Sequence, residues 1–547
     1  MISKPIITIV AVFTCYSSMA QKNSSAYSWE NLPVIQQTKF KKDTFNIINY
    51  GAIGDGTTLN TIAINKAIGD CNSKGGGVVL IPAGLWLTGP IILKSNVDLH
   101  LDRAALVQFT KDFDQYPLVE GNWEGKNSVR NQSPISATDQ LNIAITGSGV
   151  LDGNGDVWRQ IGKDRLTENE WKRKVASGGI VSEDGKTWYP SEKNRLGHKM
   201  NAADAIKNLK TIKDYEPIKD FLRPNLVVIT RCKKVLLQGV TFQNSPAWCL
   251  HPLMCEDLSV RNVYVKNPEW AQNGDGIDVE SCKNVLIEGS TFECGDDGIC
   301  VKSGRDEEGR KRGMPTENMI VRNDIVYHAH GGFVIGSEMS GGARNIFVSD
   351  CSFIGTDKGL RFKTARGRGG IVENIYCKKI YMKDIVGEAI YFDMYYFTRP
   401  PAPGQKVDIP AVNEGTPQFR NFYISDIACD GAEKGIFIRG LPEMGIKNIY
   451  LTNVVLKTRR GVEIIEANNI SLNNVRTEAG NNFPQVYVEN STNINLDGFK
   501  YDKSANVLFS INGDRTSAIH IINTDVSNAK VKSQFNNGAT ATSLIIN

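Results

Sequence analysis

A short strand pattern recurs along most of this 547-residue chain and constrains its fold more than any other feature. Each copy alternates apolar and polar residues and then turns at Gly, Asn or Asp, as in CKNVLIEGSTF (282–292), RNIFVSDCSF (344–353) and KNIYLTNVVL (447–456). When the copies are aligned on a shared asparagine, that residue falls at positions 284, 318, 345, 374, 421, 448, 469 and 493. The step between copies varies from 21 residues (448 to 469) to 47 residues (374 to 421). The alternation predicts strands, and the repetition predicts a stacked architecture.

A unit this short cannot bury its own hydrophobic face, but it can do so when it is stacked on its neighbours. The pattern therefore predicts an all-β, single-stranded parallel β-helix, in which each strand pairs with the next coil about 4.8 Å away. The variable steps then correspond to loops of different length. A β-propeller is the alternative, but its blades repeat every ~40–45 residues, which is longer than most steps here.

The start of the repeat region has the features of a terminal cap. Asn60 is expected to cap a short helix whose Ile64, Ala67, Ile68 and Cys71 recur at i, i+3, i+4 and i+7. Such a helix would cover the open apolar end of the first coil.

These features divide the chain into three parts. We expect a signal peptide at 1–20, an N-terminal extension at 21–45 and a β-helix catalytic domain at 46–547. Residues 157–222 are charged and lysine-rich and break the repeat, so they are interpreted as an insertion. Two interpretations of this insertion remain open: a solvent-exposed surface segment, or a wall of a substrate site.

The first 20 residues predict export. Lys4 precedes an apolar run at 6–13, and Ser18-Met19-Ala20 provides a cleavage site of small residues. A lipoprotein anchored through Cys15 is the weaker alternative. The location expected for the mature protein is the periplasm or the extracellular space.

Composition excludes several classes of function. A net charge of +4 is too small for this length to indicate a nucleic-acid partner, and no later stretch reaches the ~20 apolar residues that span a bilayer. The cysteines form no C-x-x-C pair, so we expect no structural zinc, while disulfides remain open. The segment NGDGID (273–278) resembles a calcium loop, but its twelfth position is Asn284 rather than Glu. We expect no metal, no cofactor and a monomer.

Charged residues recur at spacings close to one coil. Asp275 precedes Asp296 by 21 residues, and His330 follows Asp297 by 33. Arg361 follows His330 by 31 residues, and Lys363 comes two residues later. Each gap fits one coil, with or without a loop, so these side chains are expected to meet on one patch.

Such a patch has the groups that glycoside hydrolysis requires. One carboxylic acid protonates the leaving oxygen, and another carboxylate acts as the nucleophile or activates water. Crowded carboxylates separate one another's pKa values, so that one stays protonated while its neighbours ionise. The Arg361-x-Lys363 pair places two cations on one strand, where they suit a carboxylated sugar, and Lys302 adds a further cation nearby.

Four short motifs in this order resemble the signature of the polygalacturonase family of glycoside hydrolases. They are Asn273-Gly274-Asp275, Asp296-Asp297, His330-Gly331 and Arg361-Phe362-Lys363. The resemblance runs from about residue 45 to near the C-terminus and implies a right-handed parallel β-helix that cleaves pectin with inversion. Gly274 replaces the usual Thr, and Ala329 replaces the usual Gly or Ser, and both changes leave the preferred sugar less defined.

The resemblance also implies roles for individual residues. Asp296 would be the general acid, Asp275 and Asp297 would activate water, and His330 would support the acid. The expected substrate-binding residues are Asn273, Lys302, Arg361, Lys363 and Tyr396. The expected partner is a pectic polysaccharide or an oligogalacturonide.

Other functions remain open. A pectate or pectin lyase is the nearest rival enzyme, a non-catalytic pectin-binding β-helix is the rival from another class, and rhamnogalacturonan or another branched pectin is an alternative substrate. GSEMSGGARN (336–345) resembles exo-acting bacterial members, and the 157–222 insertion is a candidate wall. For inversion, we expect the paired carboxyl groups to lie ~6.5–9.5 Å apart.

Overall fold

The computed structural model describes residues 27–402, 404–405, 407–501 and 505–547. The chain divides into two units, Met1–Leu32 and Pro33–Asn547. In the first unit, an antiparallel bridge pairs Ser28 with Asn31. The predicted signal peptide and residues 21–26 of the predicted extension lie outside the described residues.

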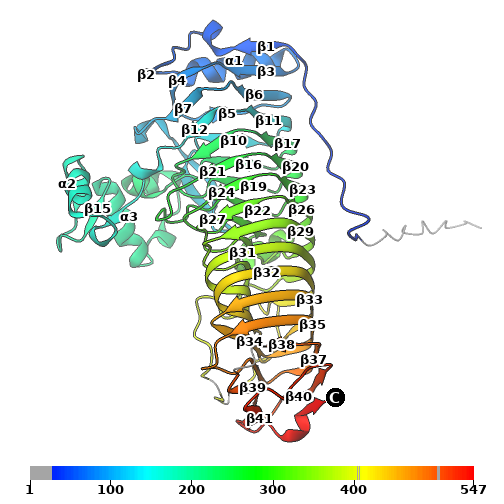
Figure 1. Ribbon diagram of the computed structural model, residues 1–547. Coiled ribbons are helices and arrows are strands. Elements are labelled where there is room, and N and C mark those ends of the chain that lie inside the picture. The colour runs from blue at the N-terminus through cyan, green and yellow to red at the C-terminus, as the bar shows by residue number, and fades with distance from the viewer. Residues whose placement is uncertain (1–26, 403, 406, 502–504) are drawn as a thin grey trace, which may run out of the picture. The chain divides into compact units, whose positions relative to one another are not determined.

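The second unit is a right-handed parallel β-helix, as predicted, and its strands pair in parallel from coil to coil (Figure 1). One stack of strands lies on the face that carries the candidate site. We call these the site strands: β16 (Val227–Thr230), β19 (Leu250–Leu253), β22 (Ile277–Glu280), β25 (Ile299–Lys302), β28 (Phe333–Ile335) and β30 (Leu360–Lys363). Their register is continuous, since Ile277 pairs with Ile299, Ile299 with Phe333 and Phe333 with Leu360.

A second stack contains β17 (Lys233–Gln238), β20 (Glu256–Arg261), β23 (Lys283–Glu288) and β26 (Thr316–Arg322). A third contains β18 (Thr241–Gln243), β21 (Tyr264–Lys266), β24 (Thr291–Glu293) and β27 (Ile325–Tyr327). In later coils these stacks merge into long strands: β29 (Ala343–Ile354), β31 (Ile371–Asp393), β32 (Gln418–Arg439), β33 (Ile446–Thr458) and β35 (Ala467–Ala479).

The recurring asparagines form a hydrogen-bonded ladder along the solenoid. Each has a left-handed backbone, with φ between 56° and 61° for the positions from 284 to 493. From Asn318 to Asn469, the side-chain amide of each donates to the amide oxygen of the asparagine one coil earlier. Asparagine suits this position because its short polar side chain tolerates the left-handed region and can both donate and accept. The ladder holds its register although the steps between copies differ, so the extra residues leave as loops.

The N-terminal cap is α1 (Thr61–Ser73), which buries Ile64, Ala67, Ile68 and Cys71 as predicted, together with Ala63. The predicted capping role of the Asn60 side chain is wrong. Asn60 precedes the helix, but its side chain makes no cap bond and instead bonds the backbone of Ile53 and Leu87. Its φ of −97° and ψ of 7° are not the extended values of a capping residue, which is consistent with this outcome.

The segment between β12 (Val150–Asp152) and β16 adds no strand to the parallel sheet. It contains α2 (Glu168–Ala176), α3 (Glu192–Ala202) and the 3₁₀ segment η6 (Ile212–Phe221). A small antiparallel sheet of β13 (Ile161–Gly162), β14 (Ile180–Val181) and β15 (Thr187–Tyr189) packs beside α2 (Figure 1).

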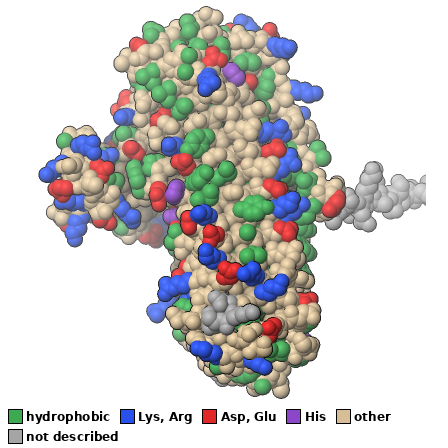
Figure 2. Space-filling model, in the orientation of Figure 1, with side chains coloured by type: hydrophobic (Ala, Val, Ile, Leu, Met, Phe, Trp, Pro, Cys, Tyr) green, Lys and Arg blue, Asp and Glu red, His purple; other side chains and the backbone are tan. Residues whose placement is uncertain are grey.

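The ten cysteines within the described residues are all free and buried, as small hydrophobic residues often are. On the face seen in Figure 2, Lys and Arg side chains alternate with Asp and Glu rather than forming a block of one sign. None of the helices in the described residues is long and apolar enough to span a membrane.

The ladder makes a testable contribution to stability. Asn448 donates to Asn421 at 2.8 Å and accepts from Asn469 at 2.9 Å, with a φ of 60°. Replacing Asn448 with Ala should lower the free energy of unfolding by about 2–4 kcal/mol, because both bonds and the tolerance of a left-handed backbone are lost. Urea unfolding measures this change. Asn448→Gly keeps the backbone tolerance and should cost less, so an equal loss in both variants would contradict this account.

Candidate active site

The turns that precede three site strands carry the carboxylates and the histidine. Asp275 lies just before β22, Asp296 and Asp297 just before β25, and His330 just before β28. Because these strands are stacked in register, their preceding turns are also stacked. The spacing in the sequence thus predicted the convergence of these residues.

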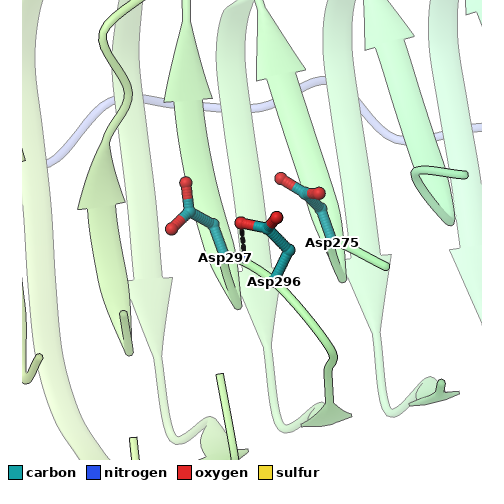
Figure 3. Close-up of side chains that lie close together, drawn as sticks. All are labelled: Asp275, Asp296 and Asp297. Atoms are coloured by element: carbon teal, nitrogen blue, oxygen red, sulfur yellow. Dashed lines mark hydrogen bonds between the residues drawn. The ribbon is translucent and has the colours of Figure 1, made fainter. Parts of the chain in front are cut away.

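The three carboxylates form one compact cluster, with Asp296 between the other two (Figure 3). One carboxylate oxygen from each of the three residues lies within 4.8 Å of those of the other two. Asp275 and Asp297 are each 2% exposed, whereas the side chain of Asp296 is 24% exposed. The backbone N–H of Asp297 donates to Oδ1 of Asp296 at 2.9 Å, which fixes the middle carboxylate.

The expected separation of the carboxyl groups is therefore wrong. The prediction of ~6.5–9.5 Å assumed that the side chains diverge from adjacent turns. They converge instead: the turn of Asp275 lies about one strand spacing from the turn that carries Asp296 and Asp297, and all three side chains point to the same side (Figure 3). Spacing alone then gives no support for inversion.

Two cations from β30 hold Asp297. Nη1 of Arg361 lies 3.0 Å from Oδ1 of Asp297, and Nζ of Lys363 lies 2.8 Å from Oδ2. Burial alone would raise the pKa of the Asp297 carboxyl, but Lys363 and Arg361 outweigh it and hold that pKa well below its usual range. The two cations therefore favour the ionised form of Asp297. Tyr396 covers both cations, since its ring centroid lies 4.8 Å from Nζ of Lys363.

Asp275 has the opposite environment. Burial, followed by repulsion from Asp278 and Asp296, raises the pKa of the Asp275 carboxyl well above its usual range. A proton that enters the cluster is thus favoured on Asp275 over Asp297.

Asp278 was not predicted from the sequence, although it belongs to the same NGDGID segment. It is fully buried in β22, and burial raises its pKa to about 6, while Lys302 opposes that rise. Nζ of Lys302 lies 3.1 Å from Asp278 and 3.8 Å from the ring centroid of Trp248. Lys302, which was predicted to bind substrate, is only 5% exposed and instead contacts the carboxylates of Asp275 and Asp278. Asp278 alternates with the core residues Ile277 and Val279 along the strand. This alternation could have shown from the sequence that its side chain faces away from the apolar core of the β-helix.

His330 contacts the cluster directly, whereas Asn273 contacts an arginine beside it. Nδ1 of His330 lies 3.2 Å from Oδ1 of Asp296, and this hydrogen bond raises the pKa of the imidazole. The amide oxygen of Asn273 accepts a hydrogen bond from Arg223 at 2.7 Å. Arg223, at the end of the 157–222 insertion, has no motif around it and was not predicted.

A hairpin packs against Trp248, which precedes site strand β19, and against the segment that follows β25. It consists of β8 (Leu118–Trp123) and β9 (Lys126–Asn131), and its tip forms ion pairs with the loop after β25. Glu124 contacts Arg305 at 2.9 Å, and Lys126 contacts Asp306 at 2.8 Å. The ring of Trp123 stacks on that of Trp248, with centroids 6.1 Å apart.

The hairpin and the 157–222 insertion both pack near the carboxylates, since Arg159 of the insertion donates to the backbone carbonyl of Gln272 at 3.3 Å. The insertion supports the hairpin, because Leu118 and Val129 of the hairpin share a small core with Ile218 and Leu222. The hairpin lacks the repeat pattern and any motif, so nothing in the sequence indicated where it would dock.

The three carboxylates are close enough together to hold a cation. The neighbouring cations oppose this, because both oxygens of Asp297 already bind Arg361 and Lys363 and Nζ of Lys302 lies 3.8 Å from Asp275. The absence of a metal cofactor stays a prediction.

Comparisons with known proteins agree with this geometry. The model of the glycosyl hydrolases family 28 matches residues 177–414, and one described as rhamnogalacturonase A/epimerase, pectate lyase-like, matches 44–194. A probable polygalacturonase of Vitis vinifera is 27% identical over 421 residues, which cover 75% of this chain and 74% of that relative. The exo-poly-alpha-D-galacturonosidase of Dickeya chrysanthemi is 30% identical over 361 residues, 64% of this chain and 57% of that relative. The crystal structure of a hyperthermoactive exopolygalacturonase from Thermotoga maritima superposes with a TM-score of 0.66 at 29% identity, covering 86% of this chain and 94% of that one.

The chain belongs to family 28 of the glycosyl hydrolases.

Family membership makes the protein a glycoside hydrolase and confirms the resemblance found in the four motifs. All four motifs contribute side chains to the site described above, and all four lie within the matched residues 177–414.

The ion pair between Lys363 and Asp297 predicts a change in the pH profile of this family 28 enzyme. In Lys363→Met, one cation near Asp297 is lost, so its pKa should rise by about 1–3 units. If Asp297 acts as an ionised base, activity falls as pH drops through that pKa, and the acidic limb of kcat/KM should move to higher pH. Lys434→Met, which removes a lysine bound to Glu463 on a later coil, is the control. An unshifted acidic limb in Lys363→Met would exclude Asp297 as the base.

Proposed function

We propose that the protein is an exo-acting polygalacturonase that hydrolyses α-1,4-galacturonosidic bonds of pectin with inversion. The observation that carries this proposal is that the three carboxyl groups of the cluster have different environments. Asp297 is held ionised by two cations, Asp275 is buried, and Asp296 is the exposed carboxyl between them.

In this proposal Asp296 is the general acid. It is the cluster's most accessible carboxyl, and His330 contacts it from the solvent side. Asp297 and Asp275 bind the attacking water, with Asp297 as the ionised acceptor. A direct nucleophilic role suits Asp297 poorly, because both of its oxygens are bound by Arg361 and Lys363. This reasoning, and not the carboxyl separation, now supports inversion.

Arg361 and Lys363 also disfavour the lyase alternative. Elimination needs a neutral basic residue to remove a proton. The pKa values of both side chains are raised by Asp297 although burial opposes the rise, so both remain charged. We propose that they and Tyr396 contact the carboxylate of a galacturonyl unit.

Exo action is supported by the hairpin wall and by the relatives named exo-poly-alpha-D-galacturonosidase and exopolygalacturonase. A cleft closed on one side admits the end of a chain and excludes its middle. Rhamnogalacturonan or another branched pectin is the alternative substrate. Export through residues 1–20 and a monomeric state stay predictions.

Replacing Asp296 with Asn should lower kcat by roughly 10²–10⁴, the usual effect of removing a positioned general acid. The matched control is Asp426→Asn, a carboxylate on a different strand stack that accepts a bond from Asn453 at 3.0 Å. In the wild type, proton NMR during the first minutes should show β-galacturonic acid before the α anomer. Turnover of Asp296→Asn within a few-fold of wild type would reassign the acid, and early α anomer would assign a nucleophile.

Shortening the hairpin should change the mode of attack. Replacing Glu120–Val129 with an Asn-Gly turn removes the wall and should let the enzyme cleave within chains. Longer oligogalacturonides should then appear early, and viscosity should fall faster for each bond cleaved. Ser128→Ala keeps the hairpin and serves as control. If the shortened variant still releases only the shortest products, the hairpin does not determine exo action.

A further inference from the structure

A turn directly after β31 holds one aromatic residue in an unfavourable backbone conformation. The N–H of Thr398 donates to the backbone carbonyl of Tyr395 at 2.8 Å and closes a four-residue turn, with Phe397 in its third position. Phe397 has a φ of 61°, and among the described residues it is the sole Phe, Tyr or Trp in the left-handed region. A positive φ at this turn position is normally taken by Gly or Asn, because bulkier side chains are strained there.

The side chain of Phe397 is also unusually open to solvent. Phe397 is 83% exposed, the highest value for any Phe, Tyr or Trp that the structure describes. An exposed aromatic ring alone needs no explanation, since single apolar residues are common on protein surfaces. Here, however, the ring gains little from burial while the backbone is strained. Strain of this kind is typical of residues that contact a ligand, where the side chain is kept for its function.

The turn lies beside the two cations that are proposed to bind a galacturonyl carboxylate. The N–H of Tyr396 donates at 3.0 Å to the backbone carbonyl of Thr364, which follows Lys363 in the chain. The ring centroids of Tyr396 and Phe397 lie 4.0 Å apart, and the Tyr396 ring lies 4.8 Å from Nζ of Lys363. The exposed ring of Phe397 is therefore a neighbour of the side chains that would hold that galacturonyl unit.

The order of the coils determines which part of a polysaccharide could reach this ring. Strand β30, which carries Arg361 and Lys363, pairs with the end of β31, so the turn after β31 lies one coil beyond β30. The hairpin packs against the segment after β25, which lies in the opposite direction along the solenoid. A polysaccharide whose end points toward the hairpin would therefore extend past Arg361 and Lys363 to Phe397.

We propose that Phe397 is a specificity-determining residue whose ring stacks on the sugar unit next to the one held by Arg361 and Lys363, on the side of the leaving chain. An aromatic ring suits this task, because it offers a large apolar surface to the C–H face of a sugar ring. The placement of this unit on the leaving side rests on the proposed function. A substrate of three or more units reaches Phe397, whereas a dimer ends before it.

Kinetics on oligogalacturonides of two and three units test this role. The wild type should have a higher kcat/KM for the trimer than for the dimer. Phe397→Gly should lower kcat/KM for the trimer by about 2–10-fold, the usual effect of losing one aromatic contact, and should affect the dimer much less. Phe397→Tyr retains a ring and should keep the trimer preference. Tyr381→Ala removes another exposed ring, on the third strand stack, and should leave the preference unchanged.

Thermal unfolding separates substrate binding from a structural role. Phe397→Gly relieves the strained φ and should not lower the Tm, so its loss of trimer preference would come from the missing ring and not from misfolding. Phe397→Asn also tolerates the left-handed backbone without a ring and should give the same kinetic result. Equal losses on dimer and trimer, with a lower Tm in both variants, would mean that Phe397 only supports the turn and would overturn the inference.

The outcomes also separate this inference from the proposed function. An enzyme that hydrolyses polygalacturonate while Phe397→Gly and Phe397→Asn keep the wild-type trimer preference would overturn the role of Phe397 alone. A wild type that does not hydrolyse polygalacturonate would overturn the proposed function, and calorimetric titration with the trimer and the dimer would then test the ring. Tighter binding of the trimer that is lost in Phe397→Gly would retain the inference, and no preference for the trimer would overturn it.

Discussion

In-register stacking of parallel strands, fixed by a ladder of left-handed asparagines, is the constraint on which the rest of the structure depends. Each asparagine satisfies a backbone geometry that most residues avoid and bonds the same residue one coil earlier. Because this corner is held at every coil, chain length can vary elsewhere without a change of register. The turns before β22, β25 and β28 therefore meet although long loops separate them in the sequence.

The same stacking brings like charges together in the active site. Turns one strand spacing apart bring three carboxylates together, and each opposes the ionisation of the others. The surrounding residues stabilise the charge of one carboxylate and disfavour the charge of another. Arg361 and Lys363 stabilise charge on Asp297, while burial and Asp278 disfavour charge on Asp275. One site thus contains a carboxylate that favours ionisation and a carboxyl that favours its proton, which is the combination that acid–base hydrolysis requires.

The sequence predicted those parts of the fold and the site that follow from periodicity. The spacing of the recurring asparagine predicted the length of a coil. Gaps of about one coil then predicted that Asp275, Asp296, Asp297 and His330 lie close together. The sequence did not predict the direction of the carboxylates within the turns, since a repeat defines which residues are neighbours and not how their side chains point. For the same reason the Asn60 side chain was assigned to a helix cap, whereas in the structure it bonds the backbone of neighbouring turns.

The features that periodicity could not supply are those made by residues outside the repeat. The β8–β9 hairpin docks through Glu124 and Lys126 on a loop that follows β25, far along the chain. Arg223 reaches Asn273 from the end of an insertion. Neither contact has a spacing that a repeat would reveal, because loops are free to vary once the ladder holds the register. The β-helix thus positions the carboxylates, whereas the hairpin and the insertion determine which part of a polysaccharide can reach them.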